Sequence, residues 1–392
     1  MAKYPKRRPH GRRIPVASGY RAYVPDPLPP PIAWDAELAA RLSAADLAVG
    51  RLAGEGRRLA NPYSLIRPFI RREAVLSSRI EGTQATLGEL VAAEGGAHPE
   101  GNAADLHEVS NYVVALEYGI ERLLDLPLSL RLVREVHEKL MRGVRGNSAT
   151  PGEFRRSQNW IGPPGATLAN ATFVPPPPDL IIGCLGAWEK VLHDESFPAL
   201  VQAALMHSQF EAIHPFLDGN GRVGRLLVTL LLVARGVLPS PLLYLSAYIE
   251  ATRDEYYARL HGVTERGEWE EWLLYFLTGV ASQAEDALDR IRRVDDIVYR
   301  WRGQLPKSSS RASEAAIQLF VESPFWTVPK LAARLNVAFT TAQRAVERLE
   351  SAGVVSPTGD AKRNRVYCAR EMLALLEEPP NLKVGAPRGF ES

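Results

Sequence analysis

The sequence predicts a mainly α-helical protein that carries one β-hairpin and ends in a small winged helix-turn-helix domain. Apolar residues recur at three- and four-residue spacing through most of the chain from Asp35 to residue 296, a spacing typical of helices. Residues 152–181 interrupt this spacing with glycines, prolines and short β-type runs, which favours a hairpin or long loop. Beyond 303–313 shorter helical segments lead into a β-type stretch, which indicates a separate domain.

Length and composition narrow the class of protein. The chain has 392 residues, enough for two or three domains, and its net charge of +2 does not mark the whole molecule as a nucleic-acid or membrane binder. The two cysteines, Cys184 and Cys368, lie far apart and fit neither a disulfide framework nor a zinc site. The start lacks a signal-peptide pattern, and the most apolar run, 226–234, is too short to cross a bilayer. We therefore expect a cytoplasmic protein with no membrane contact.

The elements follow in order along the chain. Residues 1–30 are basic and then proline-rich, which predicts a flexible arm. Helical spacing then predicts helices over 35–54, 62–82, 105–124, 129–144, 181–194, 198–213, 225–236, 250–265 and 268–296. The C-terminal domain is expected over 308–378, with a helix at 312–323, a helix–turn–helix at 327–355 and a β-wing at 356–369. Residues 379–392 are expected to form a flexible tail.

The stretch HPFLDGNGRVGR, 214–225, is the most informative in the chain. Its glycines at 219, 221 and 224 read G-x-G-x-x-G, but a dinucleotide fingerprint needs a strand before the glycines and an acidic residue about twenty positions later. Here a helical segment precedes them, and PLLYLSAY (241–248) contains no acid. A zinc site from His207, His214 and Asp218 lacks the one-turn spacing that lets two histidines of one helix share a metal.

The same stretch has the parts of a phosphate site. Its glycine loop leads into a helix that starts near Arg222, so backbone N–H groups at the helix N-terminus can hold an anion. Asp218 can supply an oxygen ligand to Mg²⁺. Arg222 and Arg225 lie on neighbouring parts of one helix face and can bind phosphate oxygens. The pKa range of an ordinary histidine suits His214 to remove a proton from a hydroxyl. These residues together predict phosphate-ester chemistry.

The stretch also resembles the signature of the Fic family, H-P-F-x-D/E-G-N-G-R-x-x-R, at every fixed position. The resemblance covers roughly residues 30–300. It implies an N-terminal helical region with an inhibitory helix (31–110), a helical Fic catalytic core with a β-hairpin flap (111–300), and transfer of AMP from ATP to a hydroxyl side chain of a target protein. Because the chain keeps GNGR, AMP transfer is favoured over a kinase-like reaction. Other nucleotides or a phosphocholine donor stay open.

The resemblance implies a role for each residue of the signature. His214 resembles the base, Asp218 the Mg²⁺ ligand, and Phe216 a buried anchor for the loop. The predicted phosphate and ATP contacts are Gly219, Asn220, Gly221, Arg222, Gly224 and Arg225, with the Asn220 side chain touching phosphate.

A second match, SSRIEG (77–82), resembles the family's inhibitory motif S/T-x-x-x-E-G/N. It consists of Ser77, Glu81 and Gly82, and its place before the core resembles the class II arrangement. The resemblance implies that Glu81 pairs with Arg225 and so blocks the position at which the γ-phosphate would bind. A carboxylate and a guanidinium form a strong pair in a sheltered cleft.

Two further segments resemble parts of the family's substrate sites. Residues 157–178 resemble the flap, which would bind the backbone of the target as an added strand. Residues 252–272 resemble the nucleoside pocket, with Tyr257 and Leu260 as adenosine contacts. Thr264 stands where some relatives carry an asparagine, which leaves strict ATP preference open.

Several functions and partners remain open from the sequence. Removal of AMP, either alone or together with its addition, is an alternative activity, in which Glu81 would position water. The excess of Lys and Arg in 308–370, including AKRNR (361–365), suggests DNA contact and a DNA-binding regulator as the second class of function. A packing or homodimer role for that domain is the alternative, and the target of AMP transfer could be the protein itself.

Overall fold

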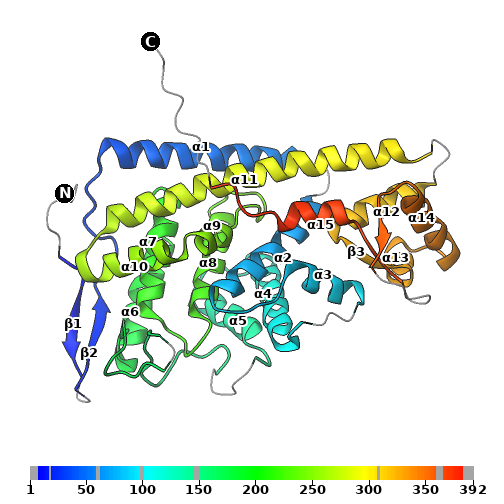
Figure 1. Ribbon diagram of the computed structural model, residues 1–392. Helices are drawn as coiled ribbons and strands as arrows, with labels where there is room; N and C mark the ends of the chain where they lie inside the picture. Colours follow the sequence, from blue (N-terminus) through cyan, green and yellow to red (C-terminus); the bar gives the residue numbers. More distant parts are fainter. Residues whose placement is uncertain are drawn as a thin grey trace, which may run out of the picture.

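Helices dominate the computed structural model of this protein, and two small antiparallel sheets complete it (Figure 1). The structure describes residues 8–16, 19–58, 62–97, 101–144, 150–163, 165–306, 310–358 and 365–382. The mainly α-helical class predicted from the sequence is confirmed. Within the described ranges, no helix combines the length and the apolar character needed to cross a membrane.

The helices before residue 305 form one body around a continuous hydrophobic core. Their bounds are α1 (Ala36–Arg58), α2 (Pro62–Ile80), α3 (Leu87–Gly95), α4 (Ala103–Arg122), α5 (Leu130–Leu140), α6 (Pro178–Leu192), α7 (Ala199–Ile213), α8 (Asn220–Ala234), α9 (Ser246–Ala251), α10 (Arg253–Arg266) and α11 (Trp269–Gln304). With 36 residues, α11 is about 54 Å long. It lies beside α1 along one side of the molecule and continues to the C-terminal elements (Figure 1).

The centre of this body is the pair α7 and α8. Almost every residue of both helices is buried on all sides rather than along one stripe, and this includes polar residues such as Gln202, Arg222 and Arg225. They pack against each other and are joined by the short loop 214–219. The loop predicted to carry the chemistry is therefore fixed at both ends by the most buried helices of the core.

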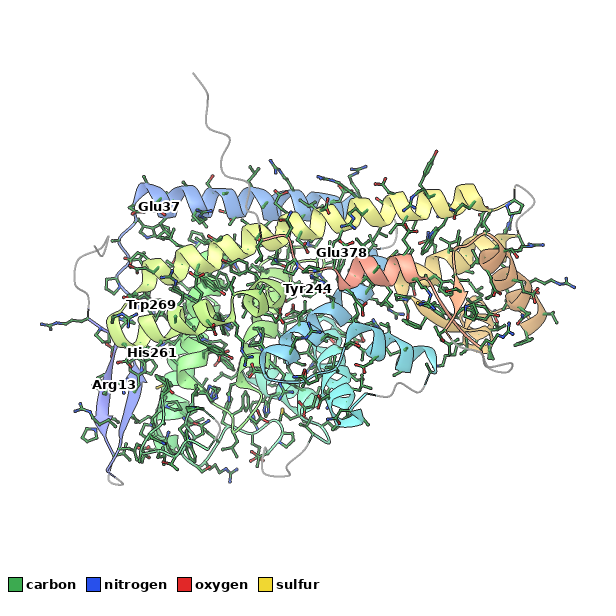
Figure 2. All side chains as sticks on the ribbon, viewed as in Figure 1. Arg13, Glu37, Tyr244, His261, Trp269 and Glu378 are labelled. Atoms are coloured by element: carbon green, nitrogen blue, oxygen red, sulfur yellow. The ribbon has the colours of Figure 1, made fainter. Side chains whose placement is uncertain are left out.

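The N-terminal segment differs from the flexible arm predicted for 1–30. Strands β1 (Gly11–Pro15) and β2 (Arg21–Pro25) form an antiparallel hairpin. The backbone N–H of Tyr23 donates to the carbonyl of Val174 at 2.8 Å, and the Tyr23 ring lies 5.7 Å from that of Phe173. These buried contacts hold the segment in place. The neighbouring prolines led to the prediction of a flexible arm, so the two strands were not recognised in the sequence. Arg13 of β1, labelled in Figure 2, forms an ion pair with Glu265 near the end of α10.

The C-terminal elements are three helices, a three-stranded sheet and a final helix. Their bounds are α12 (Arg311–Glu322), β3 (Phe325–Thr327), α13 (Val328–Leu335), α14 (Phe339–Ser351), β4 (Ser356–Pro357), β5 (Val366–Cys368) and α15 (Arg370–Glu377). The strand order is β3-β5-β4, antiparallel throughout. Residues 361–364 of the basic AKRNR stretch lie outside the described residues, as does 383–392 of the expected tail.

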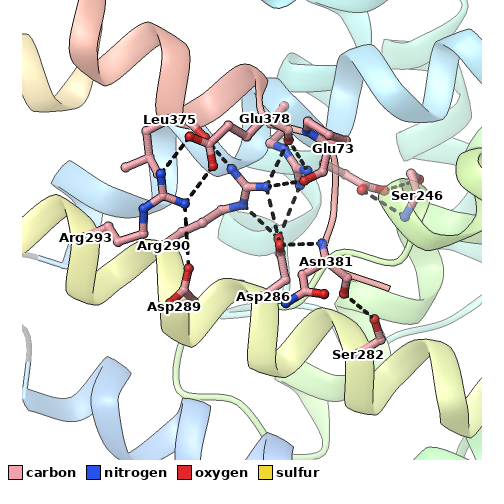
Figure 3. A network of polar contacts seen from close by, with 12 residues as sticks. Glu73, Ser246, Ser282, Asp286, Asp289, Arg290, Arg293, Leu375, Glu378 and Asn381 are labelled. Carbon is pink, nitrogen blue, oxygen red and sulfur yellow. Dashed lines mark hydrogen bonds and ion pairs between the residues drawn. The ribbon is translucent and has the colours of Figure 1, made fainter. Parts of the chain in front are cut away.

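Residues 375–381, which we call the C-terminal strap, are bound to α11 and α2 by a network of polar contacts (Figure 3). Arg290 of α11 donates to the carbonyls of Leu375, Glu378 and Pro379. Arg293 pairs with the Glu378 carboxylate through two contacts of 2.6 Å. From α2, Arg72 donates to the Glu378 carbonyl at 3.3 Å. The strap makes 379–381 part of the folded body rather than of the tail predicted for 379–392.

Candidate active site

A few residues of the signature determine the shape of the loop between α7 and α8. His214 ends α7 in the left-handed conformation, with φ of 49°, and Pro215 follows it. Gly219 also has a positive φ, of 76°, immediately before α8 begins. A Cβ atom at Gly219 would lie 2.8 Å from the sulfur of Met141, so a side chain does not fit there. The turn therefore needs glycine for both conformation and space.

Asn220 closes this loop with its side chain. Its Oδ1 accepts from the N–H of Phe216 at 2.8 Å, and its Nδ2 donates to the carbonyl of Phe216 at 2.9 Å. Phe216 itself is fully buried, as expected of the anchor. Both polar groups of the Asn220 side chain are thus bound to Phe216, so in this structure it shapes the loop, whereas the sequence predicted that it touches phosphate.

The first turn of α8 lies against Glu81. A helix leaves its first backbone N–H groups without intrahelical partners, and these attract negative charge. A Cβ at Gly221 would collide with Oε1 of Glu81, so the carboxylate lies directly on the glycine of this first turn. The place predicted for a phosphate is next to the carboxylate predicted to exclude it.

Arg225 joins α8 to the end of α2. Its Nη2 lies 2.7 Å from Oε1 of Glu81 and also donates to the carbonyl of Ser77 at 2.9 Å, while its Nε donates to the Ser77 hydroxyl at 2.9 Å. Gly82, with φ of 104°, follows Glu81 just after α2 ends. The structure thus brings Arg225 to Ser77 and Glu81, which precede it by 148 and 144 residues in the sequence.

Charge attraction dominates the Glu81–Arg225 pair. The Arg225 side chain is 1% exposed and that of Glu81 is 35% exposed. Burial alone would raise the pKa of Glu81, but Arg225 outweighs this effect and holds the pKa below its usual value. Burial alone would likewise lower the pKa of Arg225, and Glu81 reverses the shift. Both groups are therefore charged at neutral pH.

Arg222, the other predicted phosphate contact, is turned toward α4. Its side chain is 4% exposed, and Nη1 lies 3.0 Å from Oε2 of Glu108. Its Nη2 lies 3.8 Å from Oδ1 of Asp218, so Arg222 is shared between two carboxylates. Glu108 was not predicted as a site residue, because nothing in the local sequence connects it to the loop 114 positions away.

The ring of His214 is uncharged and lies at the end of α7. Its carbonyl accepts from Nε of Arg155 at 2.9 Å, and its ring Nδ1 is buried without a hydrogen-bond partner among the described residues. Burial, assisted by the charge of Arg155, lowers the pKa of His214 to about 4. The ring is neutral at pH 7 and able to accept a proton.

Asp218 presents its carboxylate to solvent. The side chain is 59% exposed, and Oδ1 accepts from the N–H of Gly219 at 2.6 Å. No group of three or more His, Cys, Asp or Glu side chains suited to a metal ion occurs among the residues that the structure describes. One exposed carboxylate fits Mg²⁺, since this ion usually takes one or two protein carboxylates and completes its shell with phosphate and water.

A cleft of about 390 Å³ reaches Glu211 and Ala212 of α7, which closely precede His214 in the chain. Its walls come from the predicted flap, which is closed by a β-bridge between Ile161 and Phe173, and from α7 and α10. Tyr257 and Leu260, the predicted nucleoside contacts, both line the cleft, and so does Thr264. The size and the largely apolar walls suit a small planar ligand.

Gly224 has a different environment from the one predicted. A Cβ there would collide with Oε1 of Glu211 and would lie 3.3 Å from the ring of Phe210. Because both neighbours belong to α7, the absence of a side chain at 224 lets α7 and α8 approach each other. The structure thus assigns this glycine to helix packing.

His137 of α5 is a site residue that the sequence reasoning missed. It is fully buried, and its ring stacks on that of Phe216 at 3.7 Å with an angle of 5°. Its Nδ1 accepts from the N–H of Gly152 at 2.9 Å, so Nε2 carries the proton and donates to the carbonyl of Asp218 at 3.1 Å. The available signal was a histidine on the apolar face of an amphipathic helix.

The fold and this site define a helical protein with a glycine-containing loop between two buried helices. Residues 39–121 match the model of the Fic/DOC family N-terminal region, and residues 127–232 match that of the Fic/DOC family. Over these two segments the chain is similar to the Fic/DOC family.

Curated relatives are similar over part of their length. Protein adenylyltransferase fic-1 of Caenorhabditis briggsae is 31% identical over 224 residues, which cover 54% of this chain and 39% of that protein. Protein adenylyltransferase Fic of Drosophila virilis is 31% identical over 166 residues, which cover 41% of this chain and 32% of that protein. The chain thus spans less than two fifths of the length of these relatives.

Solved structures share the fold. A Fic family protein from Desulfovibrio desulfuricans G20 matches with a TM-score of 0.58 and 19% identity, covering 87% of this chain and 98% of that one. Fic-1 from C. elegans matches with a TM-score of 0.52 and 23% identity, covering 65% and 74%. At this level of identity the likeness supports the helical fold.

Proposed function

We propose that this protein is a protein adenylyltransferase, which transfers AMP from ATP to a hydroxyl side chain of a target protein. The observation that carries the proposal is the position of the neutral His214, which lies between the N-terminus of α8 and the part of α7 whose Glu211 and Ala212 line a cleft of nucleoside size. Two relatives named protein adenylyltransferase support it, because each is 31% identical to part of this chain. The match of residues 127–232 to the Fic/DOC family model supports it as well.

The proposed reaction is a direct displacement at the α-phosphorus of ATP. The target hydroxyl oxygen attacks the α-phosphorus while His214 takes its proton; the bond from the α-phosphorus to the bridging oxygen breaks, and pyrophosphate leaves. Backbone N–H groups of the first turn of α8 face the phosphates and stabilise their charge. Asp218 would hold Mg²⁺, which offsets the charge of the triphosphate. Positioning and electrostatics supply most of the rate.

The flap would supply the place for the target. Its residues Ile161, Gly162, Thr172 and Phe173 line the cleft, and Asn159 just before them donates to the carbonyl of Phe216 at 2.9 Å. A segment of the target could pair with this strand-like edge through main-chain hydrogen bonds. Such pairing is largely independent of side chains, so it would admit serine, threonine or tyrosine.

Glu81 would hold the enzyme in an inhibited state. Its carboxylate occupies Arg225 and covers Gly221, so a bound triphosphate would have to displace it from both. Two negative groups cannot share this position without strong repulsion. Inhibition is therefore competition between the Glu81 carboxylate and the γ-phosphate for one guanidinium.

The C-terminal elements would form a winged-helix domain. The helices α13 and α14 are joined by a turn at Asn336, which adopts the left-handed conformation, and an antiparallel sheet follows. This order agrees with a helix-turn-helix and a wing. DNA binding by the domain stays a prediction from charge.

A labelling experiment tests the proposed activity. Purified Glu81→Gly protein would be incubated with Mg²⁺ and ATP carrying the label on either the α- or the γ-phosphate, alone and with a cell lysate. We expect label on protein from α-labelled ATP and none from γ-labelled ATP, because the β- and γ-phosphates leave. Label from the γ-position would identify a kinase instead, and label from neither would exclude ATP as the donor.

The loop geometry predicts an effect of His137 on the same assay. In the Glu81→Gly background, His137→Leu removes both ring hydrogen bonds and should lower kcat at least tenfold, because the Asp218 carbonyl loses its donor. His137→Gln should recover most of that loss, since an amide can still accept from Gly152 and donate to Asp218. Equal melting losses in both variants with an unchanged kcat would show that His137 stabilises the fold only.

A further inference from the structure

Two polar side chains in the cleft have no assigned partner. Ser208 and Glu211 lie three residues apart on α7, so they share one face of that helix, and both line the cleft. The Ser208 hydroxyl and Oε1 of Glu211 are buried, and neither forms a hydrogen bond with any described part of the chain. Buried polar atoms are nearly always hydrogen-bonded in native structures. This pair therefore indicates where polar groups of a ligand bind.

The surroundings keep the Glu211 carboxyl uncharged. Arg225 of α8 and Glu81 at the end of α2 face it, as does Tyr256 of α10. Arg253, Tyr257 and His261 of α10 line the same cleft. Burial raises the pKa of Glu211 to about 8, so the group is protonated at neutral pH. A protonated carboxyl can both donate and accept a hydrogen bond, and it does not repel a neighbouring phosphate.

The position of the pair along α7 identifies the part of the ligand. The helix rises 1.5 Å per residue, which puts Glu211 about 4.5 Å and Ser208 about 9 Å along the axis from His214. In the proposed reaction His214 lies at the α-phosphate. The ribose is attached directly to that phosphate and the base lies farther away, so the ribose falls at the level of Glu211.

Resting on the adenylyltransferase function, we propose that Glu211 and Ser208 are specificity residues that bind the ribose hydroxyls of the nucleotide. Hydroxyls need partners that can both donate and accept, and the neutral carboxyl and the serine hydroxyl supply both. The apolar side chains of Ile161, Phe173 and Leu260 are then left for the base. The site would select a ribonucleotide over its deoxy analogues.

The test compares ATP with 2′,3′-dideoxy-ATP, each with Mg²⁺, by calorimetric titration of Glu81→Gly protein. We expect ATP to bind at least tenfold more tightly, because a site built to hydrogen-bond a hydroxyl rejects an analogue that lacks it. Adding Glu211→Ala should weaken ATP binding and leave dideoxy-ATP binding within threefold, so the preference disappears. Glu211→Gln should restore the preference, since an amide also donates and accepts. Ser208→Ala should reduce it in part.

The controls separate this proposal from the proposed function. Glu255→Ala makes the same substitution on the exposed side of α10, where Glu255 pairs with Arg259, and should keep the full preference. Equal binding of both nucleotides by Glu81→Gly protein, or a preference that survives Glu211→Ala, would overturn the ribose proposal alone. Failure to bind either nucleotide would overturn the adenylyltransferase function and the ribose proposal with it. If Glu211→Ala does not fold, Glu211→Gln and Ser208→Ala decide the question.

Discussion

Replacing Glu81 with glycine should raise AMP transfer at least tenfold. The substitution removes the carboxylate that lies 2.7 Å from Arg225 and over Gly221, so the guanidinium and the first turn of α8 become available to the triphosphate. A tenfold gain corresponds to about 1.4 kcal/mol, well within the energy of a sheltered carboxylate–guanidinium pair. The measurement is the initial rate of transfer from α-labelled ATP at fixed Mg²⁺, for wild-type and variant protein side by side.

Graded variants distinguish charge competition from a general loosening of α2. Glu81→Gln keeps the size of the side chain and removes its charge, so its rate should lie between wild type and Glu81→Gly. Glu138→Gly places the same substitution in an exposed part of α5, where Glu138 pairs with Arg142, and should not raise the rate. Equal rates for wild type and Glu81→Gly would contradict inhibition by this carboxylate.

Replacing His214 with alanine should lower the rate of Glu81→Gly protein by roughly 10² to 10⁴, the usual contribution of a general base. The pH profile provides a second observable. Since burial and Arg155 lower the pKa of His214 to about 4, the neutral base persists as the pH falls from 8 to about 5. The rate should therefore be flat from pH 7 to about 5, where Glu211 also stays protonated, and should decline as the pH approaches 4.

Nucleotide binding is the control for this variant. The substitution leaves the His214 carbonyl that Arg155 holds, so the loop should keep its form and calorimetry should find ATP affinity within threefold of the parent. A rate that already falls by half near pH 6.5 would mean that the ring is hydrated in the working enzyme. Undiminished transfer by His214→Ala would exclude it as the base.

Local sequence patterns identified most of the helices and the loop that joins α7 to α8. They missed the hairpin of β1 and β2, whose burial against the flap involves residues about 150 positions away, and they missed the short helix α3. The start of α3 did carry a local signal, because Thr86 and Glu89 form a capping box. The final helix, α15, was also missed.

The candidate site likewise combines features that the local sequence indicated with contacts that it did not indicate. The local sequence indicated the loop that joins α7 and α8 as a candidate anion site, but the pairing of Glu81 with Arg225 came only from resemblance to a family, since 144 residues separate the two. The stacking of His137 on Phe216 and the two bonds from Asn220 to Phe216 depend on how helices and loop pack in three dimensions. No periodicity in one segment reports such contacts.

The long helix α11 and the C-terminal strap make the molecule hard to divide. Asp286 and Arg290 are both less than a tenth exposed; they bond to each other and to main-chain atoms of residues 375–381, and Arg72 of α2 reaches the same strap. Cutting the chain after α11 would leave these charges uncovered inside the body that holds Glu81. The C-terminal helices therefore cannot be exchanged for another domain on their own. Any such exchange would have to keep the contacts of the C-terminal strap with α11 and α2.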